Sequence, residues 1–584
     1  MYTWSLDNLY LGLDDPKFIE DNSRLDQLIE IIKKNANELS MDNPGETLET
    51  FLINYEELEN VAGKLSAFLQ LTLATDVTNK AYTNANVVLR QKLLQITLPS
   101  TLFEKFIEKV NDLPSVINNS PYLKEYEFML TEIKENSKYL LSENEEVLAA
   151  ELNQSGGGLF SKMQNDLIST LTCEYDGKTV PFTTIRNLAY DENQDVRRKA
   201  YEIEKDATKQ ISKASAFALN GIKKEVSTIA TKRGYASPLE ATLIQSRMNQ
   251  EILDALIQAI EESLPYFRKY LRRKGEMLGH KNGLPFYDLF APVGSSNTKY
   301  TVEEAQAFIL KNFKTFSQDL HDLAKRAFDE NWVDYLPRNG KRGGAFCSRL
   351  YPIKESRILT NFDGNIGDIS TLAHELGHAY HNFNIFNEKI LNSNYPMPIA
   401  ETASILCETI VKRAVLKEVQ SDDEKLGILE QELQDSNQVI VDILSRYLFE
   451  TEVFKRTKNE FLDEETLNEI MLDAQRKSYG DGLDPNYLHE GMWVVKGHYY
   501  STGRSFYNFP YAFGLLFAKG IYAKYQEQGP SFVNQIRKLL RLTGKANLKD
   551  VAASVGIDIT KVDFWRSSIE VIKNDIDLFL EITK

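Results

Sequence analysis

The sequence predicts a mainly α-helical fold built as more than one lobe. The chain has 584 residues, well beyond the length at which a single hydrophobic core stops growing. Apolar residues recur three and four positions apart over most of residues 16–280 and again after residue 368, which places them on one face of a helix. Only 17 prolines are present to interrupt such helices. We therefore expect long helices that bury a large core.

Turn-forming residues interrupt the helical spacing in the first half of the chain. They gather at residues 41–46, 111–122 and 155–160, where Gly, Pro and Asn supply backbone angles that a helix cannot adopt. We expect connections between helices at all three places.

Two later segments, 279–301 and 335–368, are richer still in turn formers. Within the second, the runs AFCSRLY (345–351) and RILTNF (357–362) have a strand-like composition. They predict a small, hairpin-like sheet. After residue 368 the helical spacing returns, except over the loop at 479–492.

Charge and cysteine content narrow the functional classes. The net charge is −16, with acidic and basic residues mixed along the chain and no basic stripe, so we expect no nucleic-acid partner. The three cysteines are odd in number and widely spaced, which argues against a disulfide framework and for a reducing compartment. The start of the chain lacks the pattern of a secretory signal, and no apolar run is long enough to span a bilayer. These features predict a cytoplasmic location and no membrane partner.

The pattern H-E-x-x-H occurs at His374, Glu375 and His378. We expect a helix that begins near Ile369, with Asp368 as its N-cap. Four residues are slightly more than one turn, so both imidazoles share a face with β-carbons about 5–6 Å apart and can converge on one Zn²⁺. Glu375 cannot point at the metal beside them, but it can reach a water there and act as general base.

A catalytic zinc site needs a third protein ligand. The metzincin pattern would require a glycine at position 381 and a histidine at 384, but the chain has His381 and Asn384. A carboxylate from a following helix is the remaining common choice, and residues 399–410 offer Glu401 and Glu408, two turns apart on one face. We predict that Glu401 is the ligand.

Three other polar residues near the motif either support the metal site or have a purely structural role. Glu408 is either the partner that orients a histidine ring or an ordinary core or surface residue. Asp368 is more readily a helix cap than a carboxylate that supports the site. His381 lies on the same helical side as His374 and is expected to hydrogen-bond within the core.

Three motifs in order carry a family resemblance: HELGHAYH at 374–381, IAETAS at 399–404 and GHYYSTGRSFYNFPYAFG at 497–514. With them the sequence resembles the thimet oligopeptidase and oligoendopeptidase F family of zinc metallopeptidases, most closely the oligoendopeptidase F group. In that family the first glutamate of the second motif is the third zinc ligand, which agrees with Glu401. The resemblance implies one Zn²⁺ per chain.

The third motif is similar to the family's histidine and tyrosine loop, whose side chains reach over the cleft to the substrate and the oxyanion. The matching candidates are His498, Tyr507 and Tyr511. A phenol or imidazole N–H beside the developing negative charge lowers the barrier by a few kcal/mol. The spacing departs from the commoner form and places Phe509 where a tyrosine is often found, so the donating tyrosine stays open.

The resemblance also implies a two-lobed helical body with a deep substrate channel, a zinc site on its floor and a small sheet whose edge pairs with an extended peptide. GGAFCSRL at 343–350 is the candidate edge. We expect an N-terminal helical region over 1–200, similar to that of oligoendopeptidase F, and a catalytic helical domain over 201–584.

The motifs and the resemblance together predict a zinc-dependent endopeptidase that hydrolyses internal bonds of short peptides by metal-activated water, with Glu375 moving the proton. A zinc carboxypeptidase on the same scaffold is an alternative. A peptide-binding protein without turnover is another, but such a protein has no use for the base at Glu375.

Overall fold

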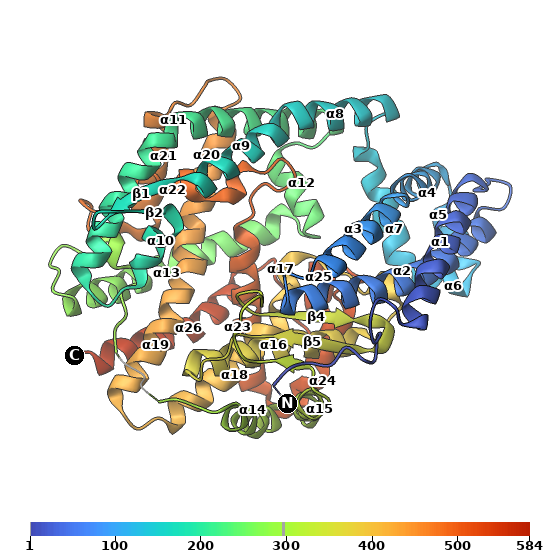
Figure 1. Cartoon of the computed structure of the whole chain (residues 1–584). Coiled ribbons are helices and arrows are strands. Elements are labelled where there is room, and N and C mark those ends of the chain that lie inside the picture. Colours follow the sequence, from blue (N-terminus) through green and yellow to red (C-terminus); the bar gives the residue numbers. More distant parts are fainter. Residues whose placement is uncertain (1, 295–297) are drawn as a thin grey trace.

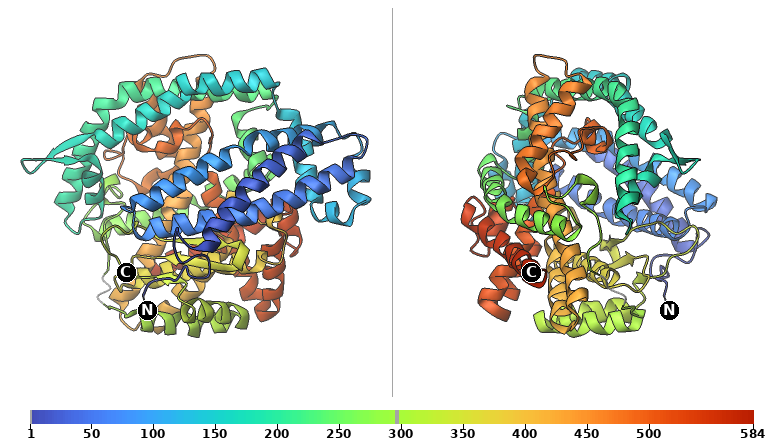
Figure 2. Two further views of the ribbon diagram at one scale, coloured as in Figure 1. Left: turned by 45° about the vertical axis from the view of Figure 1, so that its right-hand side comes forward. Right: turned by 90° about the vertical axis from the view of Figure 1, so that its left-hand side faces the viewer.

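Helices dominate the computed structural model, which describes residues 2–294 and 298–584. Figure 1 shows a body of packed helices with only short strands, so the predicted mainly α-helical fold is confirmed. In the right-hand view of Figure 2, the N-terminal helices (blue) and the helices near the C-terminus (red) lie on opposite sides of this body. Within the described residues, no helix has both the length and the apolar content needed to cross a membrane.

The first seven helices form an N-terminal body with its own hydrophobic core. The predicted apolar face of the first helix, including Leu25, Leu28 and Ile32, is fully buried there. Leu350 and Leu359 of the small sheet complete this core, so the N-terminal body rests directly on the sheet. Its helices are α1 (Pro16–Asn37), α2 (Pro44–Thr75), α3 (Lys80–Leu94), α4 (Thr97–Lys109), α5 (Leu113–Asn118), α6 (Pro121–Glu125) and α7 (Glu127–Asn136).

The next helices run across the top of Figure 1 and turn back into the body. Helix α11 continues without a break through residue 200, where the sequence analysis places its boundary. The division into 1–200 and 201–584 stays a prediction. The helices of this stretch are α8 (Glu143–Ser155), α9 (Gly157–Thr170), α10 (Phe182–Asn187), α11 (Gln194–Arg233), α12 (Pro238–Gln245) and α13 (Gln250–Met277).

A short antiparallel hairpin, β1 (Thr172–Tyr175) and β2 (Lys178–Pro181), interrupts this helical stretch. This hairpin was not predicted from the sequence. Its turn is formed by Asp176 and Gly177, both with positive φ (50° and 75°). An Asp-Gly pair is a strong hairpin signal because two-residue turns of this kind need positive φ at both positions.

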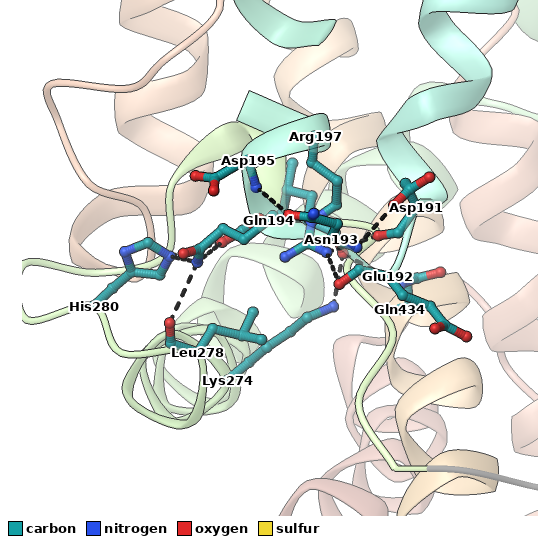
Figure 3. Close-up of polar contacts among 12 residues, drawn as sticks. Asp191, Glu192, Asn193, Gln194, Asp195, Arg197, Lys274, Leu278, His280 and Gln434 are labelled. Atoms are coloured by element: carbon teal, nitrogen blue, oxygen red, sulfur yellow. Dashed lines mark hydrogen bonds and ion pairs between the residues drawn. The ribbon is translucent and has the colours of Figure 1, made fainter. Parts of the chain in front are cut away.

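Polar contacts fix the start of α11 to the end of α13. The side-chain nitrogen of Gln194 lies 2.9 Å from Nε2 of His280 and donates to the carbonyl of Leu278 at 3.3 Å, as Figure 3 shows. Arg197, buried one turn further along α11, forms an ion pair with Asp288 at 2.8 Å. These contacts hold two helices that are far apart in sequence in one arrangement.

The predicted small sheet is present and has three strands, β3 (Val333–Asp334), β4 (Phe346–Leu350) and β5 (Glu355–Leu359). Strands β4 and β5 are antiparallel, which confirms the predicted hairpin. The parallel strand β3 was not predicted, and it makes β5 the central strand. Among the described strands β4 pairs only with β5, so its second side is an edge.

Most of the remaining helices share the largest hydrophobic core, which also takes in α13, whereas α22 packs in a separate core with parts of α11, α20 and α21. Helices α16, α18 and α23 lie near the centre of Figure 1. The helices are α14 (Val302–Phe316), α15 (Gln318–Asp329), α16 (Ile366–Ile385), α17 (Met397–Ala400), α18 (Thr402–Glu418), α19 (Asp422–Asn437), α20 (Ile443–Arg456), α21 (Glu464–Tyr479), α22 (Met492–Val495), α23 (Phe509–Gln528), α24 (Val533–Leu542), α25 (Leu548–Ala553) and α26 (Val562–Ile582).

Candidate metal centre

Helix α16 carries the H-E-x-x-H pattern, and its start differs from the prediction. The helix begins at Ile366, three residues earlier than expected, and Asn365 is its N-cap. Asp368 lies in the first turn and not at the cap. The N–H of Asp368 donates to the side chain of Asn365, and the N–H of Asn365 donates back to the Asp368 carboxylate, both at 3.0 Å. This reciprocal pair is a capping box, which satisfies two free N–H groups at the helix start.

Three predicted ligands converge at one point. The rings of His374 and His378 have centroids 5.0 Å apart and planes at 79°. Their Nε2 atoms lie 3.2 and 3.3 Å from the same oxygen of Glu401. One candidate ligand atom from each of the three residues lies within 4.8 Å of the other two. The structure therefore brings together the residues that the motifs single out.

Glu401 occupies the bend between α17 and α18, where its backbone leaves helical angles (φ −88°, ψ 4°). Its carboxylate accepts a hydrogen bond from the Ser404 hydroxyl at 2.7 Å. Helix α23 packs behind it, because a β-carbon on Gly514 would lie 3.4 Å from Cβ of Glu401. These contacts hold the carboxylate toward the imidazoles. The role of Ser404 was not predicted, although a hydroxyl three residues after the ligand is a readable signal.

Gly377 lets α18 approach α16 closely enough for this convergence. A β-carbon at Gly377 would stand 2.5 Å from the carbonyl oxygen of Ala403 and 2.5 Å from Cα of Ser404, which is far inside contact distance. Glycine within a helix costs about 0.5–1 kcal/mol relative to alanine. The close packing explains why glycine occupies the third position after His374, a point that the sequence analysis left unexplained.

A buried chain of alternating charges runs away from His374. Nδ1 of His374 lies 3.0 Å from Glu408, and Glu408 forms an ion pair with Lys412 at 2.7 Å. Lys412 also pairs with Glu432, which pairs with Lys519 of α23 at 2.7 Å. Of the two readings of Glu408, the contact favours the partner that orients a histidine ring. The rest of the chain was not predicted, because its members come from three helices distant in sequence.

Electrostatics fit a cation at the centre of this group. Burial lowers the pKa of His374, but hydrogen bonds to Glu401 and Glu408 outweigh it and raise the pKa to about 10. Burial raises the pKa of Glu401, yet the two imidazoles outweigh it and hold the pKa well below its usual range. Burial likewise opposes the ionisation of Glu408, but Lys412 and His374 bring its pKa down to about 2. The carboxylates stay ionised and favour positive charge at the imidazoles.

Glu375 lies beside this group and is 6% exposed. Its Oε2 is buried and has no hydrogen-bond partner among the described residues. Burial raises the pKa of Glu375, opposed by His378 and His374. Together with the two histidines, Glu401 and Cys347 of β4, it lines a cavity of about 550 Å³ that we call the metal pocket. A buried carboxylate with a raised pKa and a free oxygen is suited to accept a proton.

His381 does not line the metal pocket, although it stacks on Tyr395, which does. The ring centroids of this pair are 4.2 Å apart, and His381 is fully buried and hydrogen-bonded to the Thr543 hydroxyl at 2.9 Å. Burial lowers its pKa to about 3, so the ring is neutral. The expectation that it bonds within the core agrees with these contacts.

The residues of the third motif differ in their relation to the metal pocket. Tyr511 lies one turn before Gly514 on α23, the helix that packs against Glu401. Its pKa is raised by burial, by a hydrogen bond with Tyr507 and also by the charge of Glu401. Tyr507 lies edge-on to Tyr511, with centroids 5.5 Å apart.

The His498 ring packs against Tyr499, with centroids 4.4 Å apart, and not against a predicted metal ligand. Its Nε2 is buried and has no hydrogen-bond partner among the described residues. Burial lowers its pKa to about 3. None of the three candidates is among the described residues that line the metal pocket, and Tyr511 is the one whose pKa is raised by the charge of Glu401.

The donor set fits zinc. Two imidazole nitrogens and one carboxylate are the three-ligand set of catalytic zinc sites, and such sites keep a further position for water. The carboxylate of Glu408 lies beside Nδ1 of His374 and favours the tautomer that carries its proton on Nδ1. In that tautomer Nε2 has a lone pair that can bind a metal.

The fold is helical, and one cavity holds two imidazoles, a carboxylate that faces them and a second, buried carboxylate. This combination is typical of a metallopeptidase. Comparison with known families agrees. The model of Peptidase family M3 matches residues 187–571, and a model described as Oligopeptidase F matches residues 110–172. The chain belongs to Peptidase family M3, and it is a peptidase.

Relatives and solved structures of this kind match over nearly the whole chain. Oligopeptidase PepF of Bacillus subtilis (strain 168) is 24% identical over 591 residues, which span 99% of this chain and 87% of that protein. An oligoendopeptidase F homolog of Borreliella burgdorferi is 26% identical over 550 residues, which span 92% and 90%. The crystal structure of oligoendopeptidase-F from Enterococcus faecium has a TM-score of 0.71 at 17% identity and covers 97% of this chain and 98% of that one. A Chlamydophila abortus structure described as that of a peptidase reaches 0.88 at 22% identity, covering 99% and 98%. These likenesses support the fold.

Proposed function

We propose that this peptidase is a zinc-dependent endopeptidase that hydrolyses internal bonds of short peptides. The observation that carries the proposal is the free, buried oxygen of Glu375 beside the converging side chains of His374, His378 and Glu401. The names of the relatives, oligopeptidase and oligoendopeptidase, point to the same substrate class.

In this proposal His374, His378 and Glu401 would hold Zn²⁺, which would supply a Lewis acid that lowers the pKa of water at the site toward neutrality. Glu375 accepts the proton of the attacking water and passes it to the leaving amine. Tyr511 donates a hydrogen bond to the oxyanion that forms on the scissile carbonyl, and Tyr507 orients the Tyr511 hydroxyl. We retain His498 as a further proposed donor, on the resemblance alone.

The edge strand β4 supplies a way to hold the substrate. Ala345, Phe346 and Cys347 line the metal pocket, and the second side of β4 is unpaired by any described strand. An extended peptide can add to such an edge through backbone hydrogen bonds, which hold it without demanding particular side chains. We propose that the scissile bond is placed over the metal ligands in this way.

Digestion of peptides blocked at both ends tests the endopeptidase proposal. We expect cleavage at internal bonds that stops when a chelator removes the metal and returns when Zn²⁺ is restored, as followed by mass spectrometry. Failure to cut any doubly blocked peptide, with release of C-terminal residues from free ones, would establish the carboxypeptidase alternative. No cleavage of either kind by protein with stoichiometric zinc would favour a binding protein.

We propose the cytoplasm as the location. The three cysteines, Cys173, Cys347 and Cys407, are all unpaired, which suits a reducing compartment. Fractionation of cells that express the tagged chain tests this.

A further inference from the structure

A second cavity opens beside the metal pocket. It has a volume of about 380 Å³ and shares Arg349 and Asn394 with the metal pocket, so the two are neighbours. Its other walls come from α2, α4 and α7 of the N-terminal body and from the short helical turns at Tyr351–Ile353 and Ile390–Asn392. We call it the side pocket. It lies where the N-terminal body meets the sheet and the metal-binding helices.

The positions of Cys347 and Arg349 on strand β4 indicate how far apart the two pockets lie along a peptide paired with that strand. Cys347 and Glu375 line the same cavity, where burial and then the charge of Glu375 raise the pKa of the Cys347 thiol, and Arg349 follows two residues later on the same face of the strand. Two residues of an antiparallel strand span about 7 Å. A peptide paired with β4 therefore presents a side chain to the side pocket about two residues from the bond over the metal ligands.

The charges that line the side pocket are predominantly negative. Glu59 of α2 and Glu104 of α4 both line it, and Arg349 is the one cation among its described lining residues. Arg349 already donates to the carbonyl of Ser393 and to the Asn394 side chain. Among the described residues, no cation contributes to the pKa shift of Glu59 or of Glu104. Two carboxylates thus face one cavity without a counter-charge of their own.

Tyr55 connects the two carboxylates. It belongs to α2, one turn before Glu59, and lines the same cavity; burial is the main cause that raises its pKa, and Glu59 and, to a lesser degree, Glu104 raise it further. Its hydroxyl hydrogen-bonds to Glu59. Partial desolvation raises the pKa of the half-buried Glu59 and of Glu104, which is exposed at the mouth of the cavity. A bound cation would relieve this cost by pairing with both carboxylates.

Aromatic rings form the rest of the wall. Phe51 and Phe103 stack with centroids 4.2 Å apart and planes at 12°, and Phe51 also stacks on Tyr55 at 5.7 Å. Such rings form an apolar surface on which the aliphatic stem of a long basic side chain can pack. The pocket thus combines an apolar wall with an acidic end.

We propose that the side pocket binds a cationic nitrogen of the peptide substrate, that of a lysine or arginine side chain about two residues from the cleaved bond, with Glu59 and Glu104 as its counter-charges. The proposal rests on the proposed endopeptidase function and adds a preference to it. A free N-terminal amine has the same chemistry and is the alternative source of the cation.

A matched set of quenched peptides tests the preference. All members share one neutral, doubly blocked sequence, and lysine, arginine, norleucine or glutamate is placed in turn at each of three positions on either side of the scissile bond. We expect kcat/KM to be about tenfold higher for lysine or arginine than for norleucine at one position two residues from the cut, and lowest for glutamate. A second pair of peptides begins at that position, one with a free N-terminal amine and one acetylated. A higher kcat/KM for the free amine would show that the pocket binds the N-terminus as well as a basic side chain.

Variants assign the preference to the pocket. Glu59→Gln with Glu104→Gln should bring kcat/KM for the basic peptides down to the norleucine value while leaving the neutral peptide unchanged. Glu20→Gln removes one charge from an exposed position of the same N-terminal body and serves as the control, with the preference retained. Unchanged neutral-peptide cleavage also shows that the double variant is folded.

Two results would overturn the proposal: equal rates for basic and neutral peptides at every position, or a preference that survives in the double variant. Both leave the proposed endopeptidase function intact, because the neutral peptide is still cut. Absence of neutral-peptide cleavage by the unaltered protein would instead remove that function.

Discussion

The two regions that carry the candidate site residues are built in opposite ways. Helices α16 and α18 are regular and touch through Gly377, so the spacing of their residues fixes where the side chains point. Residues 501–508 form no helix, and within them Phe506 adopts a positive φ of 52° while buried against Phe454. That backbone angle, uncommon for a bulky residue, redirects the chain just before Tyr507. Side chains on packed helices follow from spacing, whereas those after an irregular turn depend on tertiary packing.

The largest expected effect lies in the regular region. Glu375→Gln keeps the shape of the side chain but removes the base, so we expect kcat to fall by about 10²–10⁴ or more. Zinc content should stay stoichiometric, because Glu375 is not among the converging ligands. Steady-state kinetics on a neutral blocked peptide and metal analysis of the same preparation check both points. Turnover equal to that of the unaltered protein would contradict the mechanism.

The irregular region is tested by comparing its two tyrosines. Tyr511→Phe should lower kcat about a hundredfold with little change in KM, since a donor to the oxyanion acts in the transition state. Tyr507→Phe should cost less than tenfold, because Tyr507 acts through its hydrogen bond with Tyr511. Kinetics of both variants on one peptide decide the matter. The reverse order of effects would mean that the turn at Phe506 aims Tyr507, and not Tyr511, at the oxyanion.

Close helix packing can be broken by one methyl group. Gly377→Ala drives a β-carbon into the backbone of α18, and we expect a loss of about 1–3 kcal/mol of unfolding free energy together with weaker zinc binding. Gly63→Ala is the matched control. It lies within α2 with open space around the added carbon, so it should stabilise by about 0.5–1 kcal/mol. Chemical denaturation of both proteins measures the difference. Equal stability would mean that α16 and α18 separate without cost.

The smallest effect should come from the contact that orients Glu401. Ser404→Ala removes the hydroxyl that donates to its carboxylate, and we expect zinc affinity to fall about tenfold. Competition with a chelator of known affinity measures the change. Ser404→Thr keeps the hydroxyl and should restore most of it. If both variants bind zinc as the unaltered protein does, the hydrogen bond is not what positions the ligand.

Prediction from sequence succeeded where local spacing determines structure. The convergence of His374 and His378 follows from one helical turn, and the strand pair β4 and β5 follows from composition. The start of α16 was misplaced by three residues because Asp368 and Asn365 are both good caps, and the capping box selects Asn365.

What was missed depends on partners from distant parts of the sequence. Strand β3 adds to the sheet in parallel, and only two residues of it pair. Lys412, Glu432 and Lys519 meet only because α18, α19 and α23 pack together. The side pocket likewise joins α2 and α4 to the turn after β4. No single stretch of sequence contains the signal for these contacts.

The buried chain from Glu408 through Lys412 and Glu432 to Lys519 has a consequence for how such a sequence can diverge. Its members alternate in sign, and each neutralises its neighbour away from water. Exchanging one alone strands an unmatched charge, at a cost of about 3–5 kcal/mol, a large share of the stability of most proteins. Viable descendants therefore change these positions in neighbouring pairs or keep all four.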